Sequence, residues 1–160
     1  MSHAIANRAK MAVRIGYDER LAHRFYAAGD LLLHPSRFEP CGLAPLYAMR
    51  YGAVPIVRQV GGLLDNVVAA TEDTIRNETA TGFTFRDANA SALLDCVDGA
   101  LAAYAQPPVW RRIQRQAMRH DSSWMASAQQ YPGLGAIGHA PCPATSGWED
   151  PPRCRSRPRS

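Results

Sequence analysis

The stretch His34-Pro-Ser-Arg-Phe-Glu-Pro-Cys-Gly-Leu43 separates two segments with different predicted structures. The run Asp30-Leu-Leu-Leu33 predicts a buried strand, and residues 43–51 predict a helix. Glu39 therefore lies in a loop between the carboxyl end of a strand and the start of a helix, where open α/β sheets bind ligands. Free backbone N–H groups at the helix start suit an anion such as a diphosphate. A carboxylate for sugar hydroxyls beside a phosphate-binding turn predicts a sugar nucleotide as ligand.

Size and composition indicate a single globular domain. The chain has 160 residues, of which 46% are hydrophobic, enough to bury a core. No apolar run reaches the roughly 20 residues of a membrane helix, and the first residues do not form a signal peptide. The four cysteines show no CxxC pair and no Cys/His metal spacing, so we expect reduced thiols in a cytoplasmic protein.

Predicted strands and helices alternate along the chain. Strands are expected at residues 11–15, 31–34, 54–57 and 82–85, and helices at 19–28, 43–51, 63–70, 89–104, 110–120 and 123–131, with a polar loop at 71–81. This order predicts an α/β fold with a parallel, doubly wound sheet. About four strands are fewer than a complete doubly wound domain needs, so we expect the second half of one.

The last part of the sequence differs in composition. Residues 132–160 are rich in Pro and Arg and lack apolar periodicity, which predicts disorder and divides the chain into a domain at 1–131 and a tail. The net charge of +4 is not gathered into a basic stripe. The clustered arginines at positions 111, 112, 115 and 119 fit a solvated helix face at least as well as a phosphate-binding surface.

Several motifs after Glu39 occur in a specific order. They are Glu-Pro-Cys-Gly-Leu, then Leu46-Tyr-Ala-Met-Arg-Tyr-Gly52, Val54-Pro-Ile-Val57 and Gly61-Gly-Leu-Leu-Asp-Asn-Val67. From about residue 13 to 131 the sequence resembles the C-terminal domain of bacterial glycogen synthases and plant starch synthases, which are retaining glucosyltransferases of the two-domain GT-B architecture. The resemblance implies a Rossmann-like, donor-binding domain that is incomplete at its N-terminal side. It also implies transfer of glucose from ADP-glucose to an α-1,4-glucan, without a metal or other cofactor.

The resemblance assigns the sugar-facing roles. Glu39 faces the glucosyl unit of the donor and accepts hydrogen bonds from its 3- or 4-hydroxyl region. Many retaining GT-B enzymes carry a second glutamate eight residues later, where this chain has Tyr47, as glycogen and starch synthases do. Tyr47 is compatible with packing near the nucleotide and with core packing of its helix. Gly61 and Gly62 either lie near the donor sugar or acceptor or serve turn geometry alone.

The nucleotide-facing residues follow from the same motifs. Cys41, Gly42, Leu43 and Ala44 supply backbone for the diphosphate, although Ala44 replaces a polar residue common in the family. We interpret the Cys41 thiol as small and buried rather than nucleophilic. Tyr17 offers a ring for stacking on adenine.

Two further residues near the loop receive weaker interpretations. A histidine at a strand end more often packs or fixes a loop than acts as a base, and the family that the sequence resembles varies at this position, so His34 is assigned no role. Arg58 is a weaker candidate for electrostatic support.

The sequence lacks the basic pair that stabilises the leaving diphosphate in the family, and it lacks the N-terminal domain with its acceptor-facing surface. We therefore expect one wall of the site, with weak donor binding and no turnover alone. Three alternatives remain: another retaining GT-B enzyme, a non-catalytic domain that binds a nucleotide sugar or glucan, and nucleic-acid binding through the Arg-rich tail. Neither nucleic acid nor a membrane is the expected partner.

Overall fold

The computed structural model describes residues 10–128. The chain divides into two compact units, Met1–Asp121 and Ser122–Ser160. The predicted tail at 132–160, and the domain boundary before it, lie outside the described residues.

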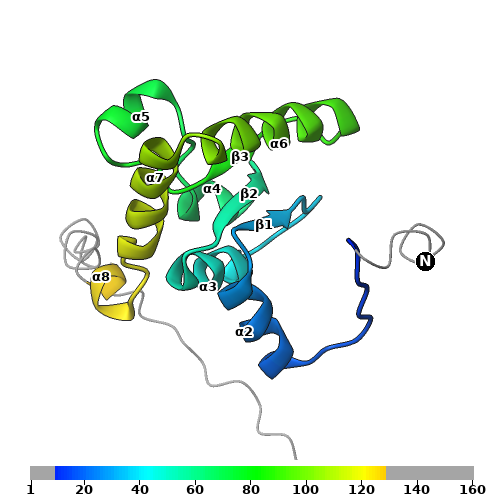
Figure 1. Ribbon diagram of the computed structural model, residues 1–160. Coiled ribbons are helices and arrows are strands. Elements are labelled where there is room, and N and C mark those ends of the chain that lie inside the picture. Colours follow the sequence, from blue (N-terminus) through cyan, green and yellow to red (C-terminus); the bar gives the residue numbers. More distant parts are fainter. Residues whose placement is uncertain (1–9, 129–160) are drawn as a thin grey trace, which may run out of the picture. The chain divides into compact units, whose positions relative to one another are not determined.

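The first unit contains helices of four to fifteen residues and short strands that largely match the predicted ones. In chain order they are α2 (Glu19–Ala28), β1 (Leu31–His34), α3 (Leu43–Tyr51), β2 (Val54–Arg58), α4 (Leu63–Asn66), α5 (Glu72–Arg76), β3 (Phe83–Phe85), α6 (Ala90–Tyr104) and α7 (Pro107–Arg119), as shown in Figure 1. Capping residues set the ends as expected. The Asp18 side chain accepts a hydrogen bond from the Leu21 N–H at 3.0 Å, and Gly52 ends α3 with a left-handed φ of 88°.

The described strands form one parallel sheet in the order β1-β2-β3. His34 of β1 pairs with Val57 of β2, and Arg58 pairs with Phe85 of β3. The carboxyl ends of the strands therefore meet at one edge of the sheet. The predicted parallel α/β fold is confirmed.

The strand β2 is covered on both faces, and its successive side chains point to opposite faces. Val54 and Ile56 pack with residues of β3, α6 and α7, including Trp110. Val57, one residue on, packs with Leu63 of α4 and with Val67 and Val60. A strand buried on both faces explains why β2 is wholly apolar until Arg58.

Residues 11–15 do not form the predicted strand. Met11, Val13 and Ile15 are 48%, 56% and 72% exposed. In the part of the chain that the structure describes, β1 is hydrogen-bonded as a strand to β2, and no strand pairs with residues 11–15. A β-like sequence without a pairing strand does not become a strand, so the sheet has three strands rather than four among residues 10–128.

Three other predictions need correction. The segment 71–81 is not a loop throughout, because Thr71 and Thr74 form a capping box that starts α5. The helix expected at 63–70 ends at Asn66, because Ala69 forms a parallel bridge with Gly82. The helix expected from residue 110 begins at Pro107, where proline is favoured because the N–H groups of the first turn have no intrahelical partner.

The arginine-bearing helix α7 is amphipathic. Trp110, Ile113 and Ala117 are buried in the first unit, and the four arginines of the helix are exposed. The second unit contains α8 (Trp124–Ala128), whose Ala126 N–H donates to the Ser123 hydroxyl at 3.2 Å. Within residues 10–128, no helix has the length and apolar character required to cross a membrane.

Candidate functional site

Glu39 is held from two sides at the carboxyl edge of the sheet. One carboxylate oxygen lies 3.0 Å from Nε2 of His34, the last residue of β1. The other accepts a hydrogen bond from the Gly42 N–H at 3.1 Å. The Glu39 side chain stays 22% exposed, so it is fixed in position without being sealed from a ligand. His34 is thus a positioning residue that the sequence did not identify, although its place at a strand end before the loop was the available signal.

These contacts favour the ionised form of Glu39. The hydrogen bond from His34 and the backbone N–H of Gly42 lower the pKa of Glu39 below its ordinary value. The group is therefore a carboxylate at neutral pH. A carboxylate oriented in this way can accept hydrogen bonds from neighbouring hydroxyl groups.

The Gly61-Gly62 turn lies directly against the backbone of the Glu39 loop. The Gly62 N–H donates to the Glu39 carbonyl at 3.1 Å. A Cβ atom on Gly61 would overlap the Glu39 carbonyl oxygen, and one on Gly62 would lie 2.6 Å from the Cys41 carbonyl oxygen. Gly61 also has a φ of 49°. The close contact between this turn and the backbone of the Glu39 loop therefore requires glycine at both positions. This requirement does not depend on a ligand.

Two side chains from β2 and α4 fasten the same loop. Asn66 donates from Nδ2 to the Cys41 carbonyl at 2.7 Å and to the Gly42 carbonyl at 3.3 Å. Arg58 donates from Nη1 to the carbonyls of Ser36 and Arg37 at 3.2 and 2.8 Å. Asn66 was missed by the sequence analysis, because only the fold brings it to the loop. Arg58 acts on the backbone of the loop.

The N-terminus of α3 leaves two backbone donors for a ligand. A helix has four N–H groups at its start without intrahelical partners, from the N-cap onward. Here the Gly42 N–H is bound by Glu39, and Pro45 has none. The N-cap residue Gly42 has no side chain that could cap α3. The N–H groups of Leu43 and Ala44 are left, so the Gly42 N–H is not the free donor that the sequence suggested.

Tyr47 and Tyr17 are exposed and do not belong to the buried core of the first unit. Tyr47 is 47% exposed, and its ring centroid lies 5.8 Å from His23 and 6.3 Å from Tyr26 of α2. Burial raises the pKa of Tyr26, and the nearby Tyr47 and Tyr17 raise it further. Tyr17 is 93% exposed. Core packing of Tyr47 is therefore not observed, and contact of either tyrosine with a nucleotide stays a prediction.

Cys41 is exposed, and its thiol is free. The prediction of a buried thiol was wrong, because the carbonyl of Cys41, and not its side chain, is turned to the protein through Asn66. Among the described residues, no group of three or more His, Cys, Asp or Glu side chains is placed to hold a metal ion.

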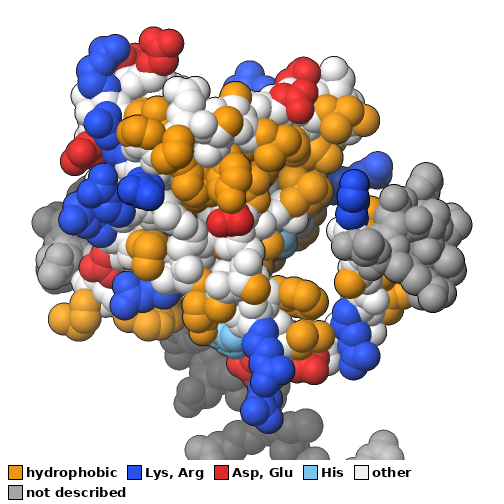
Figure 2. Space-filling model, viewed as in Figure 1, with side chains coloured by type: hydrophobic (Ala, Val, Ile, Leu, Met, Phe, Trp, Pro, Cys, Tyr) orange, Lys and Arg blue, Asp and Glu red, His pale blue; other side chains and the backbone are white. Residues whose placement is uncertain are grey.

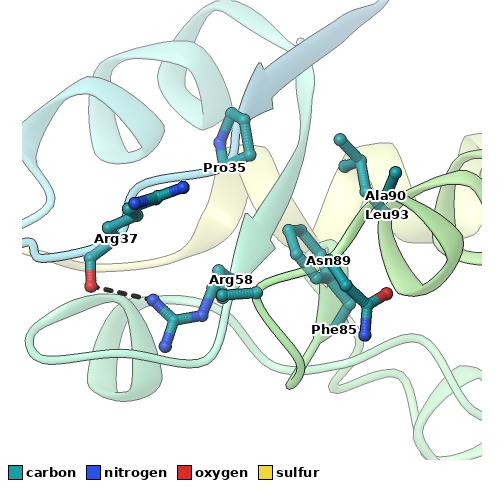
Figure 3. Close-up of a pocket in the computed structure, with 8 residues that line it drawn as sticks. Pro35, Arg37, Arg58, Phe85, Asn89, Ala90 and Leu93 are labelled. Carbon is teal, nitrogen blue, oxygen red and sulfur yellow. Dashed lines mark hydrogen bonds between the residues drawn. The ribbon is translucent and has the colours of Figure 1, made fainter.

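A pocket of about 260 Å³ is lined in part by Pro35 and Arg37 of the loop that carries Glu39 (Figure 3). Its lining comes from the three carboxyl ends of the strands and the start of α6: Pro35, Arg37, Arg58, Phe85, Ala88, Asn89, Ala90 and Leu93. Figure 3 shows the Arg58 guanidinium bonded to the Arg37 carbonyl at the boundary of this pocket. The pocket and the Glu39 site thus share one loop.

Comparison with known proteins decides the family. The family model described as "Glycosyl transferases group 1" matches residues 5–117. The chain belongs to the group 1 glycosyl transferases. The family match includes every residue of the Glu39 loop, the Gly61-Gly62 turn and the pocket.

The chain is similar to several curated proteins named as glycogen synthases. It is 54% identical over 122 residues to glycogen synthase 2 of Nitrosococcus oceani, which covers 76% of this chain and 25% of the relative. It is 49% identical over 121 residues to the glycogen synthase of Haemophilus influenzae, with the same coverage of 76% and 25%. The chain therefore spans about a quarter of the length of the curated relatives it matches.

Solved structures agree with the fold. The catalytic domain of starch synthase IV from Arabidopsis thaliana, bound to ADP and acarbose, gives a TM-score of 0.71 at 38% identity, over 85% of this chain and 28% of that one. Sucrose-phosphate synthase from Thermosynechococcus elongatus gives a TM-score of 0.57 at 24% identity, over 85% and 33%. This second likeness concerns the fold alone. The Rossmann-like fold expected of a GT-B enzyme is confirmed.

Proposed function

We propose that this chain is the donor-binding part of a glycogen or starch synthase, which transfers glucose from ADP-glucose to the non-reducing end of an α-1,4-glucan with retention of configuration. Identities of 54% and 49% to glycogen synthases support this choice over other retaining GT-B enzymes. The proposed location is the cytoplasm. No metal or other cofactor is part of the proposal.

The observation that carries the proposal is the arrangement of Glu39 beside the start of α3. Glu39 is ionised and bound by His34 and the Gly42 N–H, while Leu43 and Ala44 provide the first backbone donors of α3. A carboxylate for hydroxyls and a helix N-terminus for phosphate are the two groups that a sugar diphosphate needs. One loop of eight residues from Pro35 to Gly42 positions both.

In this proposal, Glu39 orients the glucosyl ring, and the N–H groups of Leu43 and Ala44 bind oxygens of the diphosphate. Negative charge grows on the diphosphate as the glycosidic bond breaks, so donors fixed in advance stabilise the departing group. Retention places the acceptor hydroxyl on the same face of the sugar as the leaving diphosphate. The Gly61-Gly62 turn keeps the Glu39 loop in place beneath the ring.

ADP is the proposed nucleotide because the Arabidopsis starch synthase neighbour is bound to ADP. Tyr17 is the proposed partner of the adenine ring. Its exposure of 93% leaves the ring face open to a base. Tyr47, beside Tyr26, is proposed to lie near the nucleoside.

The proposed partner is the remainder of a GT-B enzyme, which would form the opposite wall of the site. Hydrophobic side chains gather over α6 and β1 on the face seen in Figure 2. The large exposed hydrophobic residues of these two elements are Leu33 of the outer strand, 50% exposed, and Leu94, Leu101 and Tyr104 of α6, 59%, 49% and 44% exposed. An apolar flank beside an outer strand suits further strands and helices of a larger sheet. The match covers 25% of the relative, so the rest of such a sequence could supply these strands and helices.

Calorimetric titration with ADP and with ADP-glucose tests the proposal, using the parent chain and Glu39→Gln. We expect the variant to bind ADP-glucose about tenfold or more weakly, since a charge-assisted hydrogen bond to the sugar is lost. Its affinity for ADP should equal that of the parent. Glu72→Gln, at an exposed position of α5, is the matched control and should change neither affinity. Equal binding of ADP-glucose by Glu39→Gln and the parent would contradict the proposal.

A further inference from the structure

The pocket beside the Glu39 loop has a mostly apolar lining with polar groups at few points. Five of its eight lining residues are apolar: Pro35, Phe85, Ala88, Ala90 and Leu93. Phe85 is only 8% exposed, so it forms part of the floor. Such a lining suits a ligand with an apolar face and a small number of hydrogen-bonding groups.

Two of the polar side chains that line the pocket, Arg58 and Asn89, already form hydrogen bonds within the protein. Arg58 donates from Nε to the Arg86 carbonyl and from Nη1 to the loop carbonyls. The Asn89 side-chain oxygen accepts from the Ala92 N–H and caps α6. The guanidinium of Arg37, Nη2 of Arg58 and the amide NH₂ of Asn89 are the donors that the lining adds beyond these bonds. Donors of this kind can bind hydroxyl oxygens at the edge of a ring.

The volume limits the size of the ligand. At about 260 Å³, the pocket lies just below the range of about 300–1,000 Å³ typical of sites for drug-sized molecules. It therefore fits one ring of hexose size and not a whole nucleotide sugar. A pyranose has C–H groups on its faces and hydroxyls around its edge, which matches an apolar floor with donors at the rim.

We propose that this pocket binds a single glucosyl unit of the α-glucan, at a subsite separate from the donor site. The inference rests on the proposed function, because that function makes an α-glucan the sugar polymer at hand. Arg37 lines the pocket two positions before Glu39 in the same loop, and Arg58 fixes the Arg37 carbonyl. A glucan chain bound here would be held next to the loop that orients the donor sugar.

The test is NMR titration of the full chain with maltoheptaose, with a parallel titration with ADP. Ala90→Trp fills the pocket from an exposed position at the start of α6, so the fold should be kept, as circular dichroism would verify. Ala102→Trp places the same side chain at an exposed position of the same helix, outside the lining. Arg37→Met removes the rim donor and leaves the carbonyl that Arg58 binds.

Maltoheptaose should shift the amide signals of residues 85–93 in the parent and in Ala102→Trp. The affinity should fall about tenfold or more in Ala90→Trp and to a smaller extent in Arg37→Met, with ADP binding unchanged. Shifts confined to other residues, unchanged affinity in Ala90→Trp, or displacement of maltoheptaose by inorganic phosphate would overturn the subsite. Binding of ADP without binding of maltoheptaose would overturn the subsite and leave the donor proposal standing. If the parent chain binds maltoheptaose but not ADP, the result would count against the donor proposal and not against the subsite.

Discussion

The loop at residues 35–42 and the segment at residues 10–18 differ in how the chain supports them. Both precede helices, and both were predicted to contribute ligand-binding residues. The loop is bonded to β1, β2, α4 and the Gly61-Gly62 turn, so its backbone is fixed on several sides. The segment 10–18 forms no strand, and its apolar side chains Met11, Val13 and Ile15 are exposed. A site residue has a defined position only where other parts of the chain supply contacts to its backbone.

The largest expected effect comes from a glycine under the loop. Gly61→Ala combines a left-handed φ with overlap of the new Cβ and the Glu39 carbonyl oxygen, so we expect a loss of about 2–4 kcal/mol in the free energy of unfolding. Chemical denaturation measures this loss. Gly16→Ala in the unsupported segment also has a positive φ, but no atom lies within 4 Å of its Cβ, so only backbone strain is added and the loss should be smaller than for Gly61→Ala. Similar losses in both variants would remove the difference between the two regions.

A smaller effect is expected from the side chain that binds the loop carbonyls. Asn66→Ala removes the hydrogen bonds to Cys41 and Gly42 and should cost about 1–2 kcal/mol. Asp65→Ala, at the exposed neighbouring position of α4, should change stability by less than about 0.5 kcal/mol. Thermal unfolding of the two variants gives the comparison. If Asn66→Ala unfolds like Asp65→Ala, the loop does not depend on this contact.

Acid should weaken the loop in the parent more than in Glu39→Gln. The pKa of Glu39 is lowered in the folded state, so its contribution to stability is present above the unfolded-state pKa of about 4.3 and is lost as the pH falls through the folded-state value. Thermal unfolding between about pH 6 and pH 3 should therefore show a steeper decline for the parent than for the variant. Glu72→Gln is the control and should keep the steep profile. Parallel profiles for the parent and Glu39→Gln would show that the hydrogen bonds to Glu39 do not form in solution.

The smallest stability effect is expected at Tyr17. The side chain is 93% exposed, so Tyr17→Ala should change the free energy of unfolding by less than about 0.5 kcal/mol. The same change should weaken ADP and ADP-glucose equally, because the adenine is common to both, whereas Tyr17→Phe should keep the affinity. Calorimetry separates these cases. Undiminished affinity of Tyr17→Ala for both ligands would exclude stacking on the base.

The elements that the sequence predicted well are those whose signals are local. Asp18 and Gly52 mark helix ends by a side-chain oxygen and by backbone freedom, and the structure has helix ends at both. The sequence allowed Asp87 or Asn89 as the cap of the next long helix, and the structure has Asn89. The strand predicted at 11–15 failed because strand formation depends on a partner elsewhere in the chain. Residue type alone does not show whether that partner is present.

The candidate site was predicted in part for a similar reason. Glu39 and the start of α3 follow from the order strand, loop and helix, which is readable along the sequence. The contacts of His34 with Glu39 and of Asn66 with the loop depend on side-chain positions that only packing fixes. Asn66 lies 25 positions from Cys41 in the sequence. The exposure of Cys41 could not be read from residue type, since cysteine is more often buried.

The most direct measurement is a crystal structure of this chain with ADP-glucose bound. We predict glucosyl hydroxyls within hydrogen-bond distance of the Glu39 carboxylate, with diphosphate oxygens on the N–H groups of Leu43 and Ala44. The contacts of Glu39 with His34 and Gly42 should be the same as without ligand. A diphosphate bound away from the start of α3, or a glucosyl ring without contact to Glu39, would contradict the claim that this loop is a preformed donor site.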